Sequence, residues 1–181
     1  MIKATTQSKK GFTLVETLVA IAILLVTIMG PFYSLQQAIM SAYVSRDKLI
    51  AGALAQEGVE FVRVIRDNNY HTRPMPWLAG MDGSPDADSL HSADCISASN
   101  LCLVDPAQDT ITTCTGASCT PLNLSGANRY THGAGTPTKF YRTVKLTTVN
   151  ANEEKVTVTV AWRNSVATTT VVVTGELYNW Q

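Results

Sequence analysis

One long apolar stretch near the amino terminus constrains this chain more than any other feature of its sequence. From Thr17 to Ser45, 29 consecutive residues carry no charge. A bilayer core of about 30 Å needs about 20 apolar residues in helical form, so this stretch is long enough to span a membrane. Residues 1–11 contain Lys3, Lys9 and Lys10 and no acidic residue. This asymmetry predicts a single pass through the cytoplasmic membrane, with the amino terminus inside and the carboxyl-terminal part exported.

A cleaved secretory signal is the first alternative to an anchor. Such a signal has a shorter apolar region, with a small-x-small cleavage site directly after it. Here the pattern Ala53-Leu54-Ala55 lies well beyond the end of the apolar stretch. A membrane anchor therefore fits the sequence better than a secretory signal.

Glu16 lies at the start of this apolar segment, where a carboxylate is costly. At the centre of a membrane helix an acidic residue costs about 2.5–3.5 kcal/mol, and less towards the ends. In one interpretation, Glu16 lies at headgroup depth or is protonated. In the other it has a cationic partner, because a nearby positive charge favours the ionised carboxylate. Cleavage after Gly11 would create such a partner, the α-amine of Phe12, either in the same chain or in a neighbouring subunit, where the pair would fix axial register.

The residues around Gly11 read KKGFTLVE from Lys9 to Glu16. This segment resembles the class III leader junction of type IV prepilins and type II secretion pseudopilins, with a basic leader, Gly before the cut, Phe after it and Glu at the fifth mature position. The resemblance covers residues 3–45. It implies cleavage between Gly11 and Phe12 by prepilin peptidase, N-methylation of Phe12 by the same enzyme, and assembly with other pilin subunits by inner-membrane machinery.

The helix is expected to continue beyond the apolar segment. Residues 12–45 would form the transmembrane and filament-core part, after a cleaved leader at 1–11, and residues 46–67 an amphipathic continuation. The continuation is indicated by apolar residues at spacings of three and four, namely Ile50, Leu54, Gly58, Phe61 or Val62, and Ile65. Pro31 predicts a kink, because proline removes a helical hydrogen bond and clashes with the preceding turn.

Residues 68–139 have a different composition, dominated by Gly, Pro, Ser, Thr, Asn and Asp without a clear period. So long a stretch without regular structure is unusual in a compact domain, so we expect short local strands and covalent links. The links would be disulfides, because an even number of cysteines in an exported segment indicates them. The four cysteines are Cys95, Cys102, Cys114 and Cys119. They allow three disulfide connectivities, of which nearest-neighbour pairing is favoured. Zinc binding is disfavoured because no pair has the C-x2-C spacing.

Residues 140–181 read as antiparallel β-sheet. The ranges 140–149, 155–162 and 166–174 are rich in Val, Thr and aromatic residues, and short turns join them. Strict alternation from Val156 to Trp162 predicts one buried face and one wetter face. The fold class is therefore α+β: a long, kinked amino-terminal helix packed on a carboxyl-terminal antiparallel meander, with a disulfide-stapled loop region between them. This is the architecture that the pilin resemblance implies.

The sequence offers little for catalysis. No nucleophile elbow, phosphate loop or H-E-x-x-H pattern is present, His71, His91 and His132 are scattered, and no cofactor is expected. The 14 basic and 14 acidic residues balance, and nothing establishes a nucleic-acid partner. One loop is rich in acidic residues, namely Asp82, Asp86, Asp88 and Asp94. Their oxygens are of the kind that binds calcium, but a solvated acidic loop is the simpler interpretation. No metal site is assigned.

The favoured function is a structural minor subunit of a type IV pilus rather than an enzyme. Its location would be the cytoplasmic membrane, then the pilus at the cell surface or the periplasm. A type II secretion pseudopilin is the alternative with the same leader. A membrane-anchored adhesin or ligand-binding ectodomain that never polymerises is the alternative of another class. Glu16 discriminates between these classes, because a plain anchor has no use for a carboxylate at that position.

Overall fold

The computed structural model describes residues 11–72, 75–86, 89–164 and 167–179. In order along the chain it contains the long helix α1 (Leu14–His71), followed by eight strands among the described residues. The chain falls into two compact units, one ending at Arg46 and the other beginning at Asp47. We call the second unit, Asp47–Gln181, the head. Helix α1 contributes residues to both units.

Helix α1 begins at Leu14, because Thr13 acts as its N-cap. The Thr13 carbonyl accepts the N–H groups of Glu16 and Thr17 at 3.1 and 3.2 Å, and the Thr13 hydroxyl oxygen lies 3.3 Å from the Glu16 nitrogen. The predicted start at Phe12 is thus two residues too early. The helix runs through Pro31 without a break in its assignment, and the kink at this residue stays a prediction.

The carboxyl end of α1 lies at His71, about one turn beyond the predicted end at residue 67. Asn69 is buried in this last turn and donates from Nδ2 to the Ala79 carbonyl at 2.8 Å and to the Trp77 carbonyl at 3.3 Å. The last turn is therefore tied to the loop that follows it. This contact depends on tertiary structure, so the local sequence pattern could not reveal it.

The head contains a five-stranded antiparallel sheet in the order β2-β1-β6-β7-β8. Its three long strands are β6 (Phe140–Asn150), β7 (Glu153–Arg163) and β8 (Thr168–Tyr178). They form the predicted meander, but each is longer than expected, and β8 lies further along the chain than the range 166–174. The alternation along β7 is confirmed, since Val156, Val158, Val160 and Trp162 are all buried.

The region between helix and meander contains the short strands that we expected. Strands β1 (Leu101–Asp105) and β2 (Thr110–Cys114) extend the large sheet beyond β6. A second sheet has the order β4-β3-β5, and a single 3-10 turn precedes it; these elements are η1 (Gly116–Ser118), β3 (Asn123–Leu124), β4 (Tyr130–Thr131) and β5 (Thr136–Pro137).

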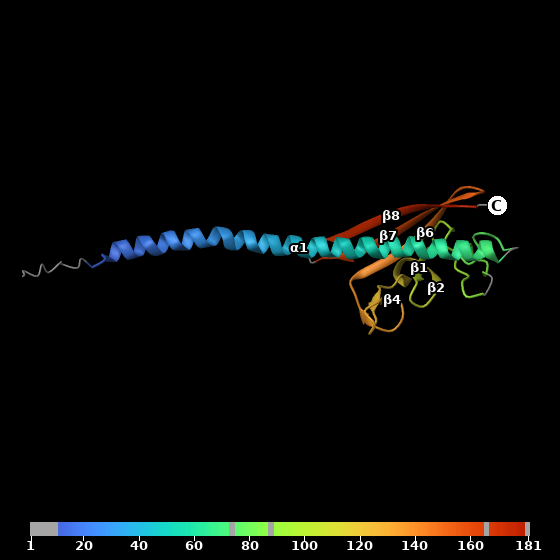
Figure 1. Ribbon diagram of the computed structural model, residues 1–181, viewed down its shortest axis with the longest axis horizontal. Helices are drawn as coiled ribbons and strands as arrows, with labels where there is room; N and C mark the ends of the chain where they lie inside the picture. The colour runs from blue at the N-terminus through green and yellow to red at the C-terminus, as the bar shows by residue number, and fades with distance from the viewer. Residues whose placement is uncertain (1–10, 73–74, 87–88, 165–166, 180–181) are drawn as a thin grey trace, which may run out of the picture. The chain divides into compact units, whose positions relative to one another are not determined.

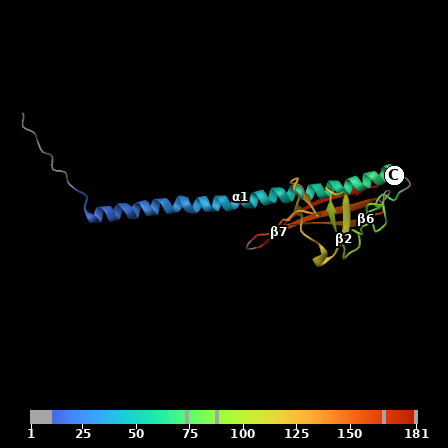
Figure 2. The same ribbon diagram turned by 90° about the horizontal axis from the view of Figure 1, so that it is seen from below.

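The core of the head lies between the residues of α1 from Asp47 onward and one face of the large sheet (Figures 1 and 2). Helix residues Ala51, Leu54, Ala55, Val59, Val62 and Ile65 are buried against sheet residues that include Val144, Leu146 and Val158. The helix and the sheet approach closely at Gly58, where an added Cβ atom would lie 3.0 Å from Cγ1 of Val158. The predicted packing of an apolar helix stripe on the sheet is therefore confirmed.

Two basic residues of the β6 region bind acidic residues of α1. The Arg142 side chain has no exposed surface, and its Nη1 lies 2.5 Å from the Glu57 carboxylate. The same guanidinium donates to the carbonyls of Leu54 and Val104, at 3.2 and 2.7 Å. Near the start of the head, Lys139 Nζ lies 2.5 Å from the buried carboxylate of Asp47. The Arg142 contacts connect α1, β1 and β6, and the partly exposed pair of Lys139 with Asp47 adds a second link to α1.

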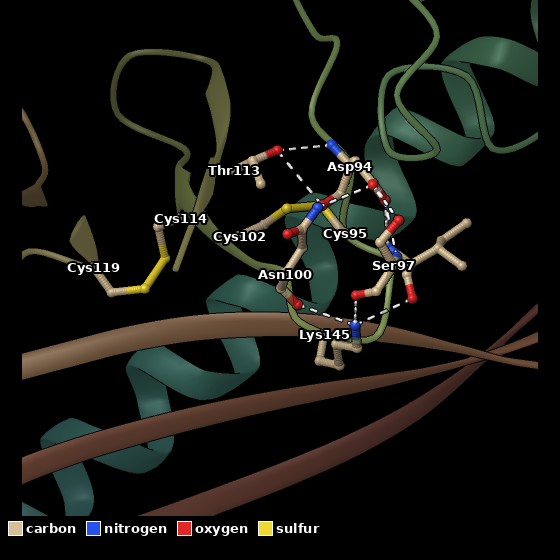
Figure 3. Close-up of a disulfide and its surroundings, with 10 residues drawn as sticks. Asp94, Cys95, Ser97, Asn100, Cys102, Thr113, Cys114, Cys119 and Lys145 are labelled. Atoms are coloured by element: carbon tan, nitrogen blue, oxygen red, sulfur yellow. Dashed lines mark hydrogen bonds between the residues drawn. A yellow bond between two sulfur atoms is a disulfide. The ribbon is translucent and has the colours of Figure 1, made fainter. Parts of the chain in front are cut away.

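Two disulfides staple the loop region, Cys95–Cys102 and Cys114–Cys119, which is the nearest-neighbour pairing. Figure 3 shows the first disulfide beside a cluster of polar contacts, in which the Asp94 carboxylate accepts hydrogen bonds from Ser97 and Asn100. Lys145 of β6 reaches the same loop and donates to the carbonyls of Ile96, Ser97 and Asn100. The covalent links and this network together hold a segment that has little regular structure.

Candidate processing and assembly site

The predicted cleavage junction lies in exposed, irregular backbone directly before α1. Gly11, Phe12 and Thr13 have no regular secondary structure, and the Phe12 side chain is 80% exposed. A peptidase must bind the scissile bond in an extended form, and exposed segments outside helices are the usual sites of proteolysis. The Gly11–Phe12 peptide bond is therefore in a segment suited to cleavage.

Thr13 and Glu16 form the N-terminal pattern of a capping box, T-x-x-E. Thr13 is the N-cap and its hydroxyl receives the Glu16 N–H, while Glu16 occupies the third position of the helix. In such a box the glutamate side chain can reach back towards the N-cap backbone. The capping role of Thr13 was not predicted, although the spacing of Thr13 and Glu16 is a recognisable signal. This capping pattern directly follows Phe12, the residue that cleavage would make the new amino terminus.

The end of α1 provides a favourable field for this carboxylate. Glu16 is an acidic residue in the first helical turn. The unpaired N–H groups there carry partial positive charge, which stabilises an anion by about 0.3–1 kcal/mol at an exposed site. The α-amine of a mature Phe12 would add a full positive charge just before the N-cap. The pairing of this amine with a Glu16 carboxylate, within one chain or between neighbouring chains, stays a prediction.

The first part of α1 has no buried face. Every residue from Gly11 to Arg46 is exposed. Large apolar side chains on all sides of the helix contribute to this surface, including Leu18, Ile21, Leu24, Leu25, Ile28, Phe32, Leu35 and Ile39. A helix that is apolar all round is typical of burial in a membrane or among other helices. The surface of this segment is therefore suited to burial in a membrane or among other helices.

Several polar side chains in this segment form hydrogen bonds within the helix. The hydroxyls of Thr17, Thr27 and Ser34 donate to carbonyls one turn earlier, at 2.8, 2.9 and 3.2 Å. Gln37 donates to the Tyr33 hydroxyl at 3.3 Å. Such internal bonds lower the cost of placing polar groups in lipid. Glu16 differs from these residues because it carries the one ionisable carboxylate within the apolar stretch.

By length and composition, α1 is the one helix among the described residues that could cross a membrane. The apolar window that meets this test has no residue buried inside the structure. Exposure of this kind separates the segment from the buried core helix of a soluble domain. Together with the two disulfides, which form in oxidising compartments, it is consistent with membrane anchoring and an exported head.

The carboxylates of the acidic loop mostly bind donors of their own loop. Asp82 accepts the N–H and hydroxyl of Ser84, and Asp86 binds His91. Ser97 donates to Asp94, and this hydrogen bond is the main reason that the pKa of Asp94 lies below its usual range. Asp88 lies outside the described residues. Among the described residues no group of three His, Cys, Asp or Glu side chains is arranged to hold a metal ion.

The three histidines, which are scattered along the sequence, occupy three different environments. His91 is buried, contacts the Asp86 carboxylate through Nδ1, and has its Nε2 3.1 Å from the Asp109 carbonyl. His132 is half-buried, and desolvation is the main cause that lowers its pKa, with a further contribution from the Arg142 charge. His71 lies exposed at the end of α1. The burial of His91 and His132 depends on the folded head, and no local sequence motif indicates it.

A comparison with known protein families supports the interpretation of the amino terminus. The family described as the prokaryotic N-terminal methylation motif matches residues 6–30, a range that includes Gly11, Phe12 and Glu16. No curated protein and no solved structure gives a significant match to the chain. The motif lies on the leader junction and on the exposed start of α1. The chain therefore carries a type IV prepilin-like class III leader, followed by a long apolar helix and an α+β, pilin-like head.

Proposed function

We propose that this chain is a minor structural subunit of a type IV pilus, processed by prepilin peptidase and assembled through the first part of α1. The observation that carries the proposal is the carboxylate of Glu16 at the start of α1. It directly follows a class III leader and precedes a helical segment, residues 17–45, that is uncharged and exposed throughout. Such a helix can be covered by lipid before assembly and by the helices of other subunits afterwards. A carboxylate at its start supplies the polar contact that a growing filament needs for register.

The steps before assembly follow from the same residues. Insertion leaves the lysines of the leader in the cytoplasm and exports the head, where the two disulfides form. Prepilin peptidase cleaves between Gly11 and Phe12 and methylates the new amine. The amine of an incoming subunit then pairs with a Glu16 carboxylate, and the apolar helices exclude lipid from between them. No step requires a catalytic group of this chain, which fits a structural protein rather than an enzyme.

The minor role is inferred from the head. A loop-rich region of many short elements, stapled by two disulfides, precedes the meander. A major subunit must repeat along a whole filament and usually has a compact head, whereas a minor subunit can carry a more elaborate one. The same leader also serves type II secretion pseudopilins. The location of the assembled chain separates the two, because a pilus can be sheared from the cell surface and a pseudopilus stays in the envelope.

The first test is the amino terminus of the mature protein. Mass spectrometry of the chain isolated from host membranes should find a mature form that begins with N-methylated Phe12. A mature chain that still begins at Met1 would show that prepilin processing does not occur. The test is independent of filament formation, so it addresses processing alone.

The second test concerns Glu16. Glu16→Gln keeps the size and polarity of the side chain but removes its charge, and Glu16→Ala removes both. We expect both variants to insert into the membrane and to be absent from sheared filaments. Thr27→Val is a matched control, since it changes a polar side chain in the same exposed helix. Normal incorporation of Glu16→Gln would refute a role for the charge and would favour the anchored, non-polymerising ectodomain.

A further inference from the structure

The outer edge of the large sheet is formed by β8. The sheet order places β8 beside β7 and gives it no second neighbour among the described residues. Its 11 residues pair with β7 in continuous register, from Glu153–Tyr178 to Arg163–Thr168, without a bulge. In an antiparallel strand every second residue directs its N–H and C=O groups away from its neighbour. The edge of β8 therefore presents a long regular row of backbone donors and acceptors.

Sheet edges of this kind are normally protected by charges, proline, bulges or short strands. From Asn164 to Gly175 the sequence contains no charged residue and no proline. The opposite edge is different: β2 has only five residues, and the disulfide of Cys114 with Cys119 closes its end. One edge of the sheet is thus short and closed by a disulfide, whereas β8 is long and has a single charged residue, Glu176, near its end.

The side chains of β8 also leave the core incomplete at this edge. Val171 and Val173 point to the helix-facing side of the sheet, where they are only half-buried and pack against the core. Val172 points to the other side and is 53% exposed. An added strand would extend both faces of the sheet and cover the open sides of these valines.

The sequence of β8 indicates which strand fits. Residues 170–174 read Thr-Val-Val-Val-Thr, a palindrome centred on Val172. If a second copy of β8 lies antiparallel with Val172 opposite Val172, each Thr170 faces a Thr174 and each Val171 faces a Val173. Like side chains of this kind pair well across antiparallel strands. This register also avoids like-charge repulsion. The one charged residue of β8, Glu176, lies opposite the uncharged Thr168 of the second copy.

We propose that β8 is a contact between two copies of this chain, joined antiparallel across their β8 edges with Val172 at the centre. The contact is isologous, since the same edge of each copy meets the other, and it therefore closes at two chains. Filament assembly through α1 joins the chains by a different surface. The edge contact thus links heads of chains that are not yet assembled, or that belong to different filaments, and it does not depend on the role of Glu16.

Cysteine cross-linking of the full chain in detergent micelles tests the register. The natural cysteines of the described head are paired in disulfides, so Val172→Cys introduces a single new thiol. Directly opposite residues of antiparallel strands lie about 4.5–5.5 Å apart between Cα atoms, within the range of a disulfide. Mild oxidation should give a dimer linked through position 172, identified by peptide mass spectrometry. Val149→Cys, equally exposed at the end of β6, is the matched control and should stay monomeric.

The proposed register also predicts which other positions on β8 can be cross-linked. Val171→Cys and Val173→Cys should cross-link to each other when the two variants are mixed, and each should cross-link poorly alone. A Val172→Cys chain that dimerises no more than Val149→Cys would overturn the proposal. So would equal cross-linking of Val171→Cys with itself, because that result would indicate random collisions and not the proposed pairing.

A charge swap tests the contact without relying on one thiol. Two charged variants are made in the Val172→Cys background. The first carries Thr170→Lys and Thr174→Lys, and the second carries Thr170→Glu and Thr174→Glu. In the proposed register, two copies of either variant place like charges opposite each other. Each charged chain alone should cross-link less than its parent, by about two-fold to thirty-fold for two cross-strand pairs. Mixing the lysine and glutamate chains should restore the dimer. The fluorescence of the buried Trp162 checks that both charged chains are still folded. If they are, and the mixture gives no more cross-linked dimer than either chain alone, the pairing is refuted.

Discussion

Replacement of Arg142 tests how the head is held together. Its guanidinium has no exposed surface and binds three oxygens, from the side chain of Glu57 and the carbonyls of Leu54 and Val104. Glu57 belongs to α1, Val104 to β1 and Arg142 to β6, so one side chain connects three elements that are distant in sequence. Arg142→Ala should therefore destabilise the head as a whole, and Arg142→Met should do so less.

The magnitude follows from what each substitution leaves behind. Both variants remove the donor from the Val104 carbonyl, and a buried acceptor without a partner costs about 1–3 kcal/mol. Arg142→Met keeps a chain of similar length in the core, so we expect about 1–3 kcal/mol for this variant. Arg142→Ala also leaves a cavity, and large-to-small changes in a core add about 2 kcal/mol or more. Glu57 is less affected, because its side chain is 43% exposed and keeps contact with water.

The assay is urea unfolding of the full chain in detergent micelles, followed by tryptophan fluorescence. Trp162 lies in the core beside Phe140, at 5.9 Å between ring centroids, so its emission reports loss of the packed head. Arg63→Ala is the matched control, because Arg63 is partly exposed and forms a surface pair with Glu60 that is worth about 1 kcal/mol or less.

Two results would refute this reasoning. If Arg142→Met unfolded at the same urea concentration as the parent, the three hydrogen bonds would make no net contribution beyond the cost of burying the charge. Buried ion pairs do behave this way in some proteins. If Arg142→Ala and Arg142→Met were equally destabilised, packing of the side-chain stem would contribute nothing.

Two further predictions concern the loop region. Cys95→Ser with Cys102→Ser should lower the free energy of unfolding by about 2–3 kcal/mol, since this disulfide closes a short loop with a sequence separation of 7, and urea unfolding measures the loss. The lowered pKa of Asp94 means that its carboxylate stabilises the folded chain above the ordinary pKa of about 3.8, and that this contribution disappears as pH falls through the lower folded value. Asp94→Asn should therefore be less stable than the parent at neutral pH, and the difference in unfolding free energy should shrink in acid. NMR titration of the Ser97→Ala variant should find the Asp94 pKa shifted upward. An unchanged Asp94 pKa would contradict the assigned role of the Ser97 hydrogen bond.

Parts of the fold were predictable because their signals are local. The alternation of valine and threonine around Val158 fixed which residues of β7 face the core, since side chains of a strand alternate between two faces. The spacing of Leu54 and Ile65 likewise indicated the stripe of α1 that packs on the sheet. The positions where elements end were less predictable. Asn69 extends α1 by a turn through contacts with Trp77 and Ala79, and a pattern of apolar residues does not contain such contacts.

The buried polar residues of the head could not be predicted from sequence. Arg142, Asp47 and His91 are of types that are normally exposed or half-exposed. Each is buried because the fold brings a partner of complementary chemistry to it, namely Glu57, Lys139 or Asp86. These partners are five to ninety-two residues away along the chain, and nothing in the local sequence marks them as pairs.

The amino-terminal part of this protein was determined by sequence alone. A basic leader, the junction at Gly11 and Phe12, the carboxylate of Glu16 and an uncharged helix long enough for a bilayer are consecutive along the chain, so their chemistry can be read without a fold. Only the tertiary structure decided that Arg142 is buried, and that β8 ends the sheet with an unprotected edge. Strand order and burial depend on contacts between distant segments, and their free energy belongs to the assembled head and not to any one stretch of residues.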